Sequence, residues 1–499
     1  MARGKIITTL RDRRQVEAGL RQMLAADSEW QFRRQAQQIA ALGSQVIPAI
    51  VGNLDRADAR LLTAMGTVAA LLNRQEVVAA LRQAILQPQR TDQGRMAAMT
   101  LLERFLGQPP DEELLTSLRD PEGVALRSLE EVLSQAEGNP ALWIEYIRGL
   151  DRQEPDVVLA VVRTLRGMGT GRAVEPLRMM AQDVRGEIAA AALQALGTLR
   201  LPEAGWALQT LRPIVHLELQ PAAGRALRKL RFAGVAIEEL PPPDPGWRAL
   251  IGPVDGLGRQ NVWFLQPGRG TAQVRFLNLL LADQAGIVEA IGHARVPALM
   301  LPPPRPLGTL HDLLLPDGSG ELLMLEAPFD LGRRLVLEAL AHNRQTQIPV
   351  AAPLRLLSPW LWGSGGADSL PPPLLPELEE PDEGLMAVSD RLLSHPAFLT
   401  WTVHNPALLQ AAEEGRHHPG RDREVWIRRL ARELFSEPMV RHLLGRRLTA
   451  MSEWLLLAGE PWLARLALAA ARAMDQESAH ELPLIRALVR RGLEAASGS

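Results

Sequence analysis

The feature that most constrains this chain is a short helical phrase that recurs at a fixed spacing. Leu165, Leu196 and Leu227 lie 31 residues apart in similar surroundings, and Leu177 and Leu208 repeat a second position at the same interval. A repeat of this length is typical of one helical hairpin, which cannot bury its apolar face alone and must stack on neighbours. The spacing therefore predicts an α-solenoid, an architecture that mostly serves binding.

The preceding part of the chain shows a similar layout with looser spacing. Apolar residues at helical intervals predict helices over residues 32–42, 60–72, 77–85 and 97–106. Gly43 and Gly107 supply helix stops, and Pro48 fits the first turn of a further short helix. Between residues 107 and 150 the spacing drifts, so the number of repeats stays open at about six or seven.

This layout resembles the short bacterial type of HEAT repeat over residues 15–235. Ala41-Leu42-Gly43 and Ala195-Leu196-Gly197 match the phrase that ends helix pairs in that family. Val46-Ile47-Pro48-Ala49 and residues 173–177 match the opening of the second helix. The resemblance implies a HEAT-like array and says little about function. The order of array, small middle domain and helical tail is similar to that of bacterial HEAT-repeat domain-containing proteins.

Changes in composition divide the rest of the chain. Four prolines in residues 240–246 predict a stiff linker, and the Gly, Pro and acidic residues of 363–384 predict a flexible one. We therefore expect a HEAT-like α-solenoid over 1–239, a small α+β domain over 247–362 and a helical domain over 385–499. The predicted fold class is mainly α.

The middle domain is predicted from a change of period. Two apolar stretches flank Asp255-Gly256-Leu257-Gly258, which is a strong β-hairpin signal. Further strands are expected over 274–281 and 322–326, followed by a helix over 330–342 that Asp330 caps. Antiparallel strands with helices on one face define the α+β assignment.

Composition limits the classes of site and partner. The chain has no cysteine, which excludes disulfides and thiolate chemistry and fits a reducing compartment, so we expect a cytoplasmic location. Its 55 basic and 57 acidic residues nearly cancel, so no global field favours nucleic acid or an anionic membrane. No apolar run reaches the roughly 18 residues of a membrane span. Only Lys5 and Lys229 are lysines, a bias that fits GC-rich codons or arginine-based recognition of phosphate and carboxylate.

One tract of the middle domain holds candidate pocket residues. Asp283, Glu289 and His293 flank and occupy a predicted helix and could form an acid/base pocket. The alternative is a capped helix, in which Asp283 is the N-cap, Gly292 is the stop and His293 is a cation at the C-terminal end.

The tail holds a candidate basic patch. Its members are Arg428, Arg429, Arg432, Arg446 and Arg447. Nucleic-acid binding would need a coherent basic stripe with exposed aromatic residues. Acidic residues are interleaved with these arginines, so a solvated helix face with i, i+4 pairs is the alternative.

Motifs for metal or phosphate chemistry are incomplete. His404, Glu413, Glu414, His417 and His418 are ligand types, but they fall in a polar loop whose adjacent residues point in different directions. His480-Glu481 begins a zinc-protease motif, yet Leu484 stands where the second histidine is needed. Residues 167–171 follow a helix and so indicate a turn instead of a phosphate loop. We expect no metal, no cofactor and no catalytic residues.

A repeat array with balanced charge and no assembled catalytic set favours a non-enzymatic scaffold or adaptor. We expect it to bind a protein partner through the concave face of the solenoid. An enzyme is the alternative, because some HEAT arrays resemble those of bilin-attachment lyases or of DNA glycosylases that act on alkylated bases. Nucleic-acid binding by the arginine-rich tail is a further alternative.

Overall fold

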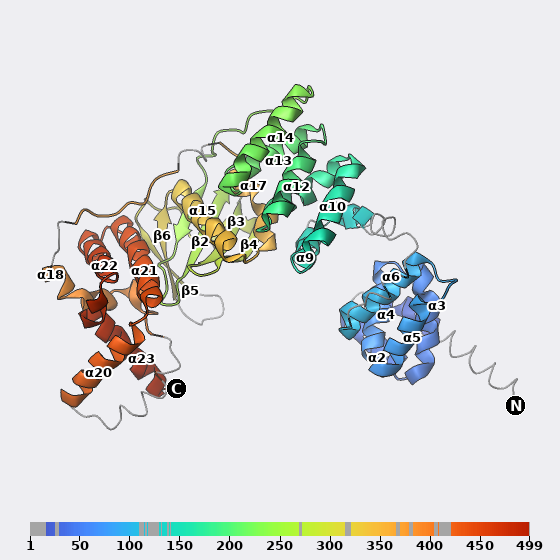
Figure 1. Cartoon of the computed structure of the whole chain (residues 1–499), viewed down its shortest axis with the longest axis horizontal. Helices are drawn as coiled ribbons and strands as arrows, with labels where there is room; N and C mark the ends of the chain where they lie inside the picture. The colour runs from blue at the N-terminus through green and yellow to red at the C-terminus, as the bar shows by residue number, and fades with distance from the viewer. Residues whose placement is uncertain are drawn as a thin grey trace, which may run out of the picture. The chain divides into compact units, whose positions relative to one another are not determined.

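The computed structural model describes residues 16–24, 29–108, 114, 117, 129–130, 132–136, 139, 141–268, 272–314, 321–365, 370–378, 383–403, 408 and 421–498. The chain packs into two compact units, Met1–Gln135 and Ala136–Ser499, whose elements are labelled in Figure 1. The division falls inside the range 1–239 that the sequence assigns to one solenoid. A continuous solenoid over that range, like the other domain limits, stays a prediction.

The described part of the first unit is helical. Its labelled helices are α2 (Glu29–Ala40), α3 (Ile47–Asn53), α4 (Ala59–Ala70), α5 (Arg74–Ile85) and α6 (Asp92–Thr100), which continues as the π-helix Leu101–Phe105. Leu54, Met65 and Leu81 lie at the centre of one buried core. Gly43 and Gly107 adopt φ values of 65° and 59°, the left-handed helix ends that the sequence predicts at these glycines.

Side chains cap the N-termini of three of these helices. Asp58 accepts a hydrogen bond from the backbone amide of Leu61 at the start of α4. Asn73 and Thr91 serve α5 and α6 in the same way. Each cap satisfies an amide that has no partner within its helix, so these polar residues set where the helices begin.

The second unit begins with a group of helices that contains the most regular repeats. They are α9 (Ala141–Leu150), α10 (Pro155–Met168), α11 (Val174–Met180), α12 (Gly186–Leu196), α13 (Pro202–Leu211) and α14 (Gln220–Phe232). We call α9–α14 the helical array. Helix α12 packs between α10 and α14, and α11 packs against α13 (Figure 1).

The recurring leucines lie where the repeat predicts a core. Leu165, Leu177, Leu196 and Leu208 are buried. Leu227 is only half-buried, and Leu230 is the leucine of α14 that enters the core. The recurring leucine therefore predicts the packed face of α10 and α12 correctly, but it misses that of α14.

Replacing Leu196 by alanine is expected to lower the free energy of unfolding by about 2–5 kcal/mol, because it opens a cavity in a packed core. Leu196 is 0% exposed. The matched control is Val157→Ala on the exposed side of α10, which is expected to change stability by no more than about 0.5 kcal/mol. Urea denaturation followed by circular dichroism measures both. Equal losses for the two variants would contradict the assignment of the packed face.

An antiparallel sheet follows the helical array. Its strands among the described residues are β1 (Arg248–Ile251), β2 (Arg259–Pro267), β3 (Gln273–Ala282), β4 (Gly286–Pro297), β5 (Leu310–Leu314) and β6 (Glu321–Ala327), in the order β4-β3-β2-β1-β6-β5. The predicted hairpin is confirmed, with Ala249 opposite Phe264 and with Gly258 at φ 80° in the turn. Strand β5 is absent from the sequence prediction.

The helix that the sequence predicts over 283–293 is wrong. Residues Gly286–Pro297 form strand β4, which pairs with β3 through contacts such as Leu277 opposite Gly292. Gly286 has φ 74°, which suits the tight turn between these strands. The predicted capping role of Asp330 is also wrong, because the N-cap residue of the following helix is Pro328 and Asp330 instead pairs with Arg333.

Helix α15 (Phe329–Thr346) covers one face of the sheet. It approaches closely at Gly332, where a Cβ atom would lie 2.6 Å from the Phe264 ring. The short helices α16 (Ala352–Leu357) and α17 (Pro359–Trp362) follow, and α16 contacts both β4 and the helical array. Trp263 and Phe276 lie on the other face of the sheet in a small cluster with Leu250.

The C-terminal part is helical and contacts the sheet. Its labelled helices are α18 (Glu383–Met386), α20 (Arg421–Leu434), α21 (Pro438–Leu457), α22 (Pro461–Ala473) and α23 (Pro483–Gly498). Two indole nitrogens, those of Trp401 and Trp454, donate to the carbonyl oxygens of Val254 and Ile251 at 2.8 and 2.9 Å. These bonds attach the helical part to the end of β1. Part of the predicted linker 363–384 lies outside the described residues.

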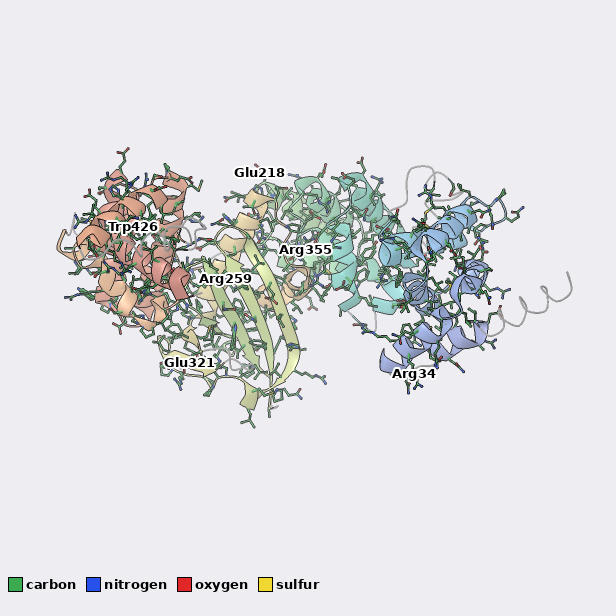
Figure 2. All side chains as sticks on the ribbon, turned by 90° about the horizontal axis from the view of Figure 1, so that it is seen from below. Arg34, Glu218, Arg259, Glu321, Arg355 and Trp426 are labelled. Atoms are coloured by element: carbon green, nitrogen blue, oxygen red, sulfur yellow. The ribbon has the colours of Figure 1, made fainter. Side chains whose placement is uncertain are left out.

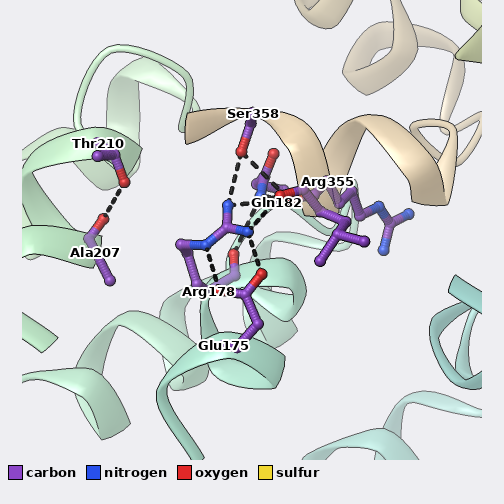
Figure 3. A network of polar contacts seen from close by, with 8 residues as sticks. Glu175, Arg178, Gln182, Ala207, Thr210, Arg355 and Ser358 are labelled. Atoms are coloured by element: carbon purple, nitrogen blue, oxygen red, sulfur yellow. Dashed lines mark hydrogen bonds and ion pairs between the residues drawn. The ribbon is translucent and has the colours of Figure 1, made fainter. Parts of the chain in front are cut away.

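A buried polar network joins the helical array to α16 (Figure 3). Arg178 on α11 is 1% exposed, and its guanidinium donates to the carbonyl oxygens of Arg355 and Leu356 and to the hydroxyl of Ser358 at 2.7–2.9 Å. Glu175 accepts from the same guanidinium. Arg355, labelled in Figure 2, lies at this junction. The helical array therefore packs against α16 and Ser358, although the predicted linker 240–246 separates them in the sequence.

Among the described helices, none combines the length and apolar character that crossing a membrane requires.

Candidate functional site

A recess lined mainly by charged side chains lies on helix α20. Val425, Arg428, Arg429 and Arg432 follow one another at i, i+3, i+4 and i+7, a spacing that places them on one face of the helix. Ile427, Leu430 and Ala431 are buried on the other side, so packing fixes which way the helix turns. The arginines are consequently held at the surface.

Two later segments complete the recess. The 3₁₀-helix Glu477–Glu481 contributes His480 and Glu481, and α23 contributes Arg486. Together with the α20 face they enclose about 660 Å³. We call this site the arginine groove, lined by Val425, Arg428, Arg429, Arg432, His480, Glu481 and Arg486.

Two hydrogen bonds fix the orientation of the histidine ring that lines the arginine groove. The Nδ1 atom of His480 lies 3.0 Å from the carbonyl oxygen of Glu477, which can only accept, so Nδ1 carries the hydrogen. The Nε2 atom lies 3.2 Å from Nε of Arg432, which donates to it. The ring thus holds the Arg432 guanidinium in place, and its Nε2 atom also lies 3.9 Å from a carboxylate oxygen of Glu481.

The arginine groove carries an excess of positive charge. Arg428, Arg429 and Arg486 form no ion pair with any residue in the described part of the chain. Glu481 is the one acidic residue in the lining, and Glu424 on the neighbouring face is bound by Arg490 at 2.5 Å. Guanidinium groups offer only donors, in a planar fork that matches carboxylate and phosphate. Such a lining has the chemistry to bind an anion.

The structure divides the predicted basic patch between two sites. Arg428, Arg429 and Arg432 line the arginine groove, whereas Arg446 and Arg447 belong to α21 and line a smaller recess of about 130 Å³. The Nε atom of Arg447 lies 2.6 Å from Oδ2 of Asp283, so a carboxylate neutralises that guanidinium. Arg447 thus has an ion-pair partner, whereas Arg446 has none among the described residues.

The three predicted pocket residues do not meet. Asp283 lies in the β3–β4 turn against Arg447. Glu289 and His293 face the same side of the edge strand β4, opposite Leu280 and Phe276, and four residues of strand separate them by about 13 Å. No acid/base pair forms from this set.

The predicted histidine and glutamate cluster at 404–418 lies outside the described residues. Within the described ranges, no three His, Asp or Glu side chains are grouped closely enough to hold a metal ion.

Sequence reasoning missed four members of the arginine groove: Val425, His480, Glu481 and Arg486. His480 and Arg486 lie far along the chain from α20, and only the packing of α20 against α23 and the 3₁₀-helix brings them together. A signal for the groove was present in the helical spacing of Arg428, Arg429 and Arg432.

No family model matches this sequence, and no curated protein or solved structure matches it. The resemblance to HEAT repeats therefore rests on the sequence phrases, and function rests on the residues of the sites.

Proposed function

We propose that this protein is a non-enzymatic adaptor that binds an anionic segment of a protein partner in the arginine groove. One observation carries the proposal. The guanidinium groups of Arg428, Arg429 and Arg486 line one recess, and none of them has a carboxylate partner among the described residues. Charges left in this state gain most from an added carboxylate, because bidentate arginine–carboxylate hydrogen bonds are among the strongest polar contacts in proteins.

The lining favours an acidic protein segment over a nucleic acid. Among the described residues, no Phe, Tyr or Trp side chain lines the arginine groove, and its one imidazole, His480, is held by Glu477 and Arg432, whereas stacking on aromatic rings is a main source of affinity for single strands. Val425 is 67% exposed beside the arginines, which offers a contact for an apolar residue of a peptide. A segment that combines acidic and apolar residues fits both features.

The HEAT-like array is the second part of the proposal. The alternate packing of α10, α12 and α14 supports it, as do the buried recurring leucines. In this proposal the concave face of the array provides another contact with a protein partner. A cytoplasmic location belongs to the same proposal because the chain has no cysteine.

The triple variant Arg428→Gln, Arg429→Gln, Arg432→Gln is expected to bind a fluorescein-labelled, glutamate-rich peptide about 100-fold more weakly than the unaltered protein. It removes the charge of one helix face and leaves the buried side of α20 intact. Fluorescence anisotropy at fixed ionic strength measures both affinities, and the difference should shrink as salt is added because screening weakens exposed charges.

The matched control is Arg225→Gln, Arg228→Gln, Arg231→Gln on the exposed side of α14, which removes the same charge elsewhere. Affinity within about twofold of the unaltered protein is expected. Equal weakening by both triple variants would reduce the effect to non-specific charge. A single-stranded oligonucleotide of equal charge that binds more tightly than the peptide would favour the nucleic-acid alternative. Failure of the unaltered protein to bind the peptide would reject the proposal.

A further inference from the structure

A second cavity lies between the helical array and α15, away from the arginine groove. It encloses about 410 Å³. Its walls come from residues 181–184 after α11, from the first turn of α12, from residues 214–219 between α13 and α14 and from the last turns of α15. We call it the array cavity, and Glu218 at its edge is labelled in Figure 2. Its volume falls within the range of pockets that hold small organic molecules.

Arg344 brings a positive charge into the wall of the array cavity. Its Nη1 atom donates to the carbonyl oxygen of Ile214 at 2.9 Å, and its Nε atom is buried with no acceptor. No carboxylate among the described residues lies within ion-pair distance of this guanidinium. Burial lowers the pKa of Arg344, and no neighbouring acid opposes that effect. A half-buried cation in this state is stabilised by any anion that can reach it.

The other charged groups of the wall are already engaged or lie in solvent. Asp183 is held by Arg185 through contacts of 2.8 and 3.0 Å. Glu218 is exposed, and its Oε2 atom lies 3.7 Å from Nδ1 of His216. Neither carboxylate lies within ion-pair distance of Arg344, so its guanidinium has no carboxylate partner among the described residues.

The rest of the wall is largely apolar. Val184, Ile214, Val215 and Leu340 are buried side chains that line it, together with Ala189. A cavity that combines one cation with an apolar surface selects ligands that have one anionic group and a hydrocarbon body.

We propose that the array cavity binds a small organic carboxylate, whose anionic group pairs with Arg344 and whose apolar body packs on Val215 and Leu340. Such a ligand touches the helical array and α15 at once. Its binding therefore adds to the contacts that hold these two parts together and raises the stability of the second unit.

Octanoate is the probe that tests this proposal, with octanol as its uncharged match. The unaltered protein is expected to bind octanoate saturably at one site by isothermal titration calorimetry. The variant Arg344→Gln, which keeps a hydrogen-bond donor, is expected to weaken octanoate binding at least about tenfold and to leave the weaker binding of octanol unchanged. A variant that merely collapsed the cavity would lose both ligands.

Ala341→Leu supplies the second variant, because it adds volume to the wall and keeps the guanidinium. It is expected to weaken the binding of octanoate and octanol together, and it carries the test alone if Arg344→Gln does not fold. The proposal is overturned if octanoate fails to bind the unaltered protein, or if Ala341→Leu binds octanoate as tightly as the unaltered protein. Equal binding of octanoate by Arg344→Gln also overturns it.

Discussion

Replacing Arg178 by methionine is expected to lower the free energy of unfolding by about 3–5 kcal/mol, the range found when one partner is removed from a buried charged network. The change removes a guanidinium donor from the carbonyl oxygens of Leu356 and Arg355 in a buried site, and the Arg355 oxygen keeps the weaker, uncharged donors Gln182 and Ser358. Glu175 also loses the cation that it binds. Urea denaturation followed by circular dichroism measures the loss.

The control for Arg178 is Arg148→Met, which breaks an ion pair between exposed side chains, Arg148 and Glu145. Its expected cost is no more than about 1 kcal/mol, because exposed pairs contribute little. Hydrogen exchange gives a second measure: amides of α16 should lose protection in Arg178→Met and keep it in Arg148→Met. Unchanged protection of α16 in both variants would show that the network does not hold this helix on the array.

Replacing Arg334 by methionine is expected to cost about 3–5 kcal/mol at the contact between α15 and α21. Nη2 of Arg334 donates to both carboxylate oxygens of Glu453 at 2.6 Å. Glu453 is 8% exposed, so its charge is left in a site that water hardly reaches, with the amide of Leu374 as its remaining donor. The measurement is again the free energy of unfolding.

The double variant Arg334→Met, Glu453→Met tests the reason for that loss. Removing both charges is expected to restore most of the stability, because a buried ion pair replaced by apolar side chains is often neutral or stabilising. If the double variant were as unstable as Arg334→Met alone, the loss would come from packing and not from the unpaired carboxylate.

Elements with strong local signals could be predicted from the sequence. The helix predicted over residues 60–72 forms as α4 (Ala59–Ala70), since apolar residues recur along it at helical intervals. The β1–β2 hairpin follows from the Asp-Gly turn at residues 255–256. In both cases the residues that decide the structure are neighbours in the chain.

Strand β4 shows where local reading fails. Its residues include Glu289 and Ala290, which suit helices, and a break in the β3–β4 register at Leu280 and Leu281 disturbs the alternation that marks a strand. The strand forms because β3 offers a partner edge, a tertiary interaction that no local pattern contains. The pocket expected from Asp283, Glu289 and His293 assumed a helix at this position and has no basis in a strand.

The arginine groove could be predicted in part. The spacing of Arg428, Arg429 and Arg432 places them on one helix face. The interleaved acidic residues suggested that this face is neutral, but Glu424 pairs with Arg490 and not with these arginines. Arg486 joins the groove only through tertiary packing. Sequence patterns predict faces of single helices, whereas a site made by several helices depends on how they pack.

The junction at Arg178 has a consequence for the order in which the protein forms during synthesis. Its acceptor in Arg355 is 177 residues further along the chain, so at ribosomal rates of about 5–20 residues per second the guanidinium waits roughly 10–35 s for its partners. During that interval the nascent chain presents an incomplete polar surface on α11. We therefore expect chaperones to contact this protein after the helical array has been synthesised and before residues 355–358 have joined it.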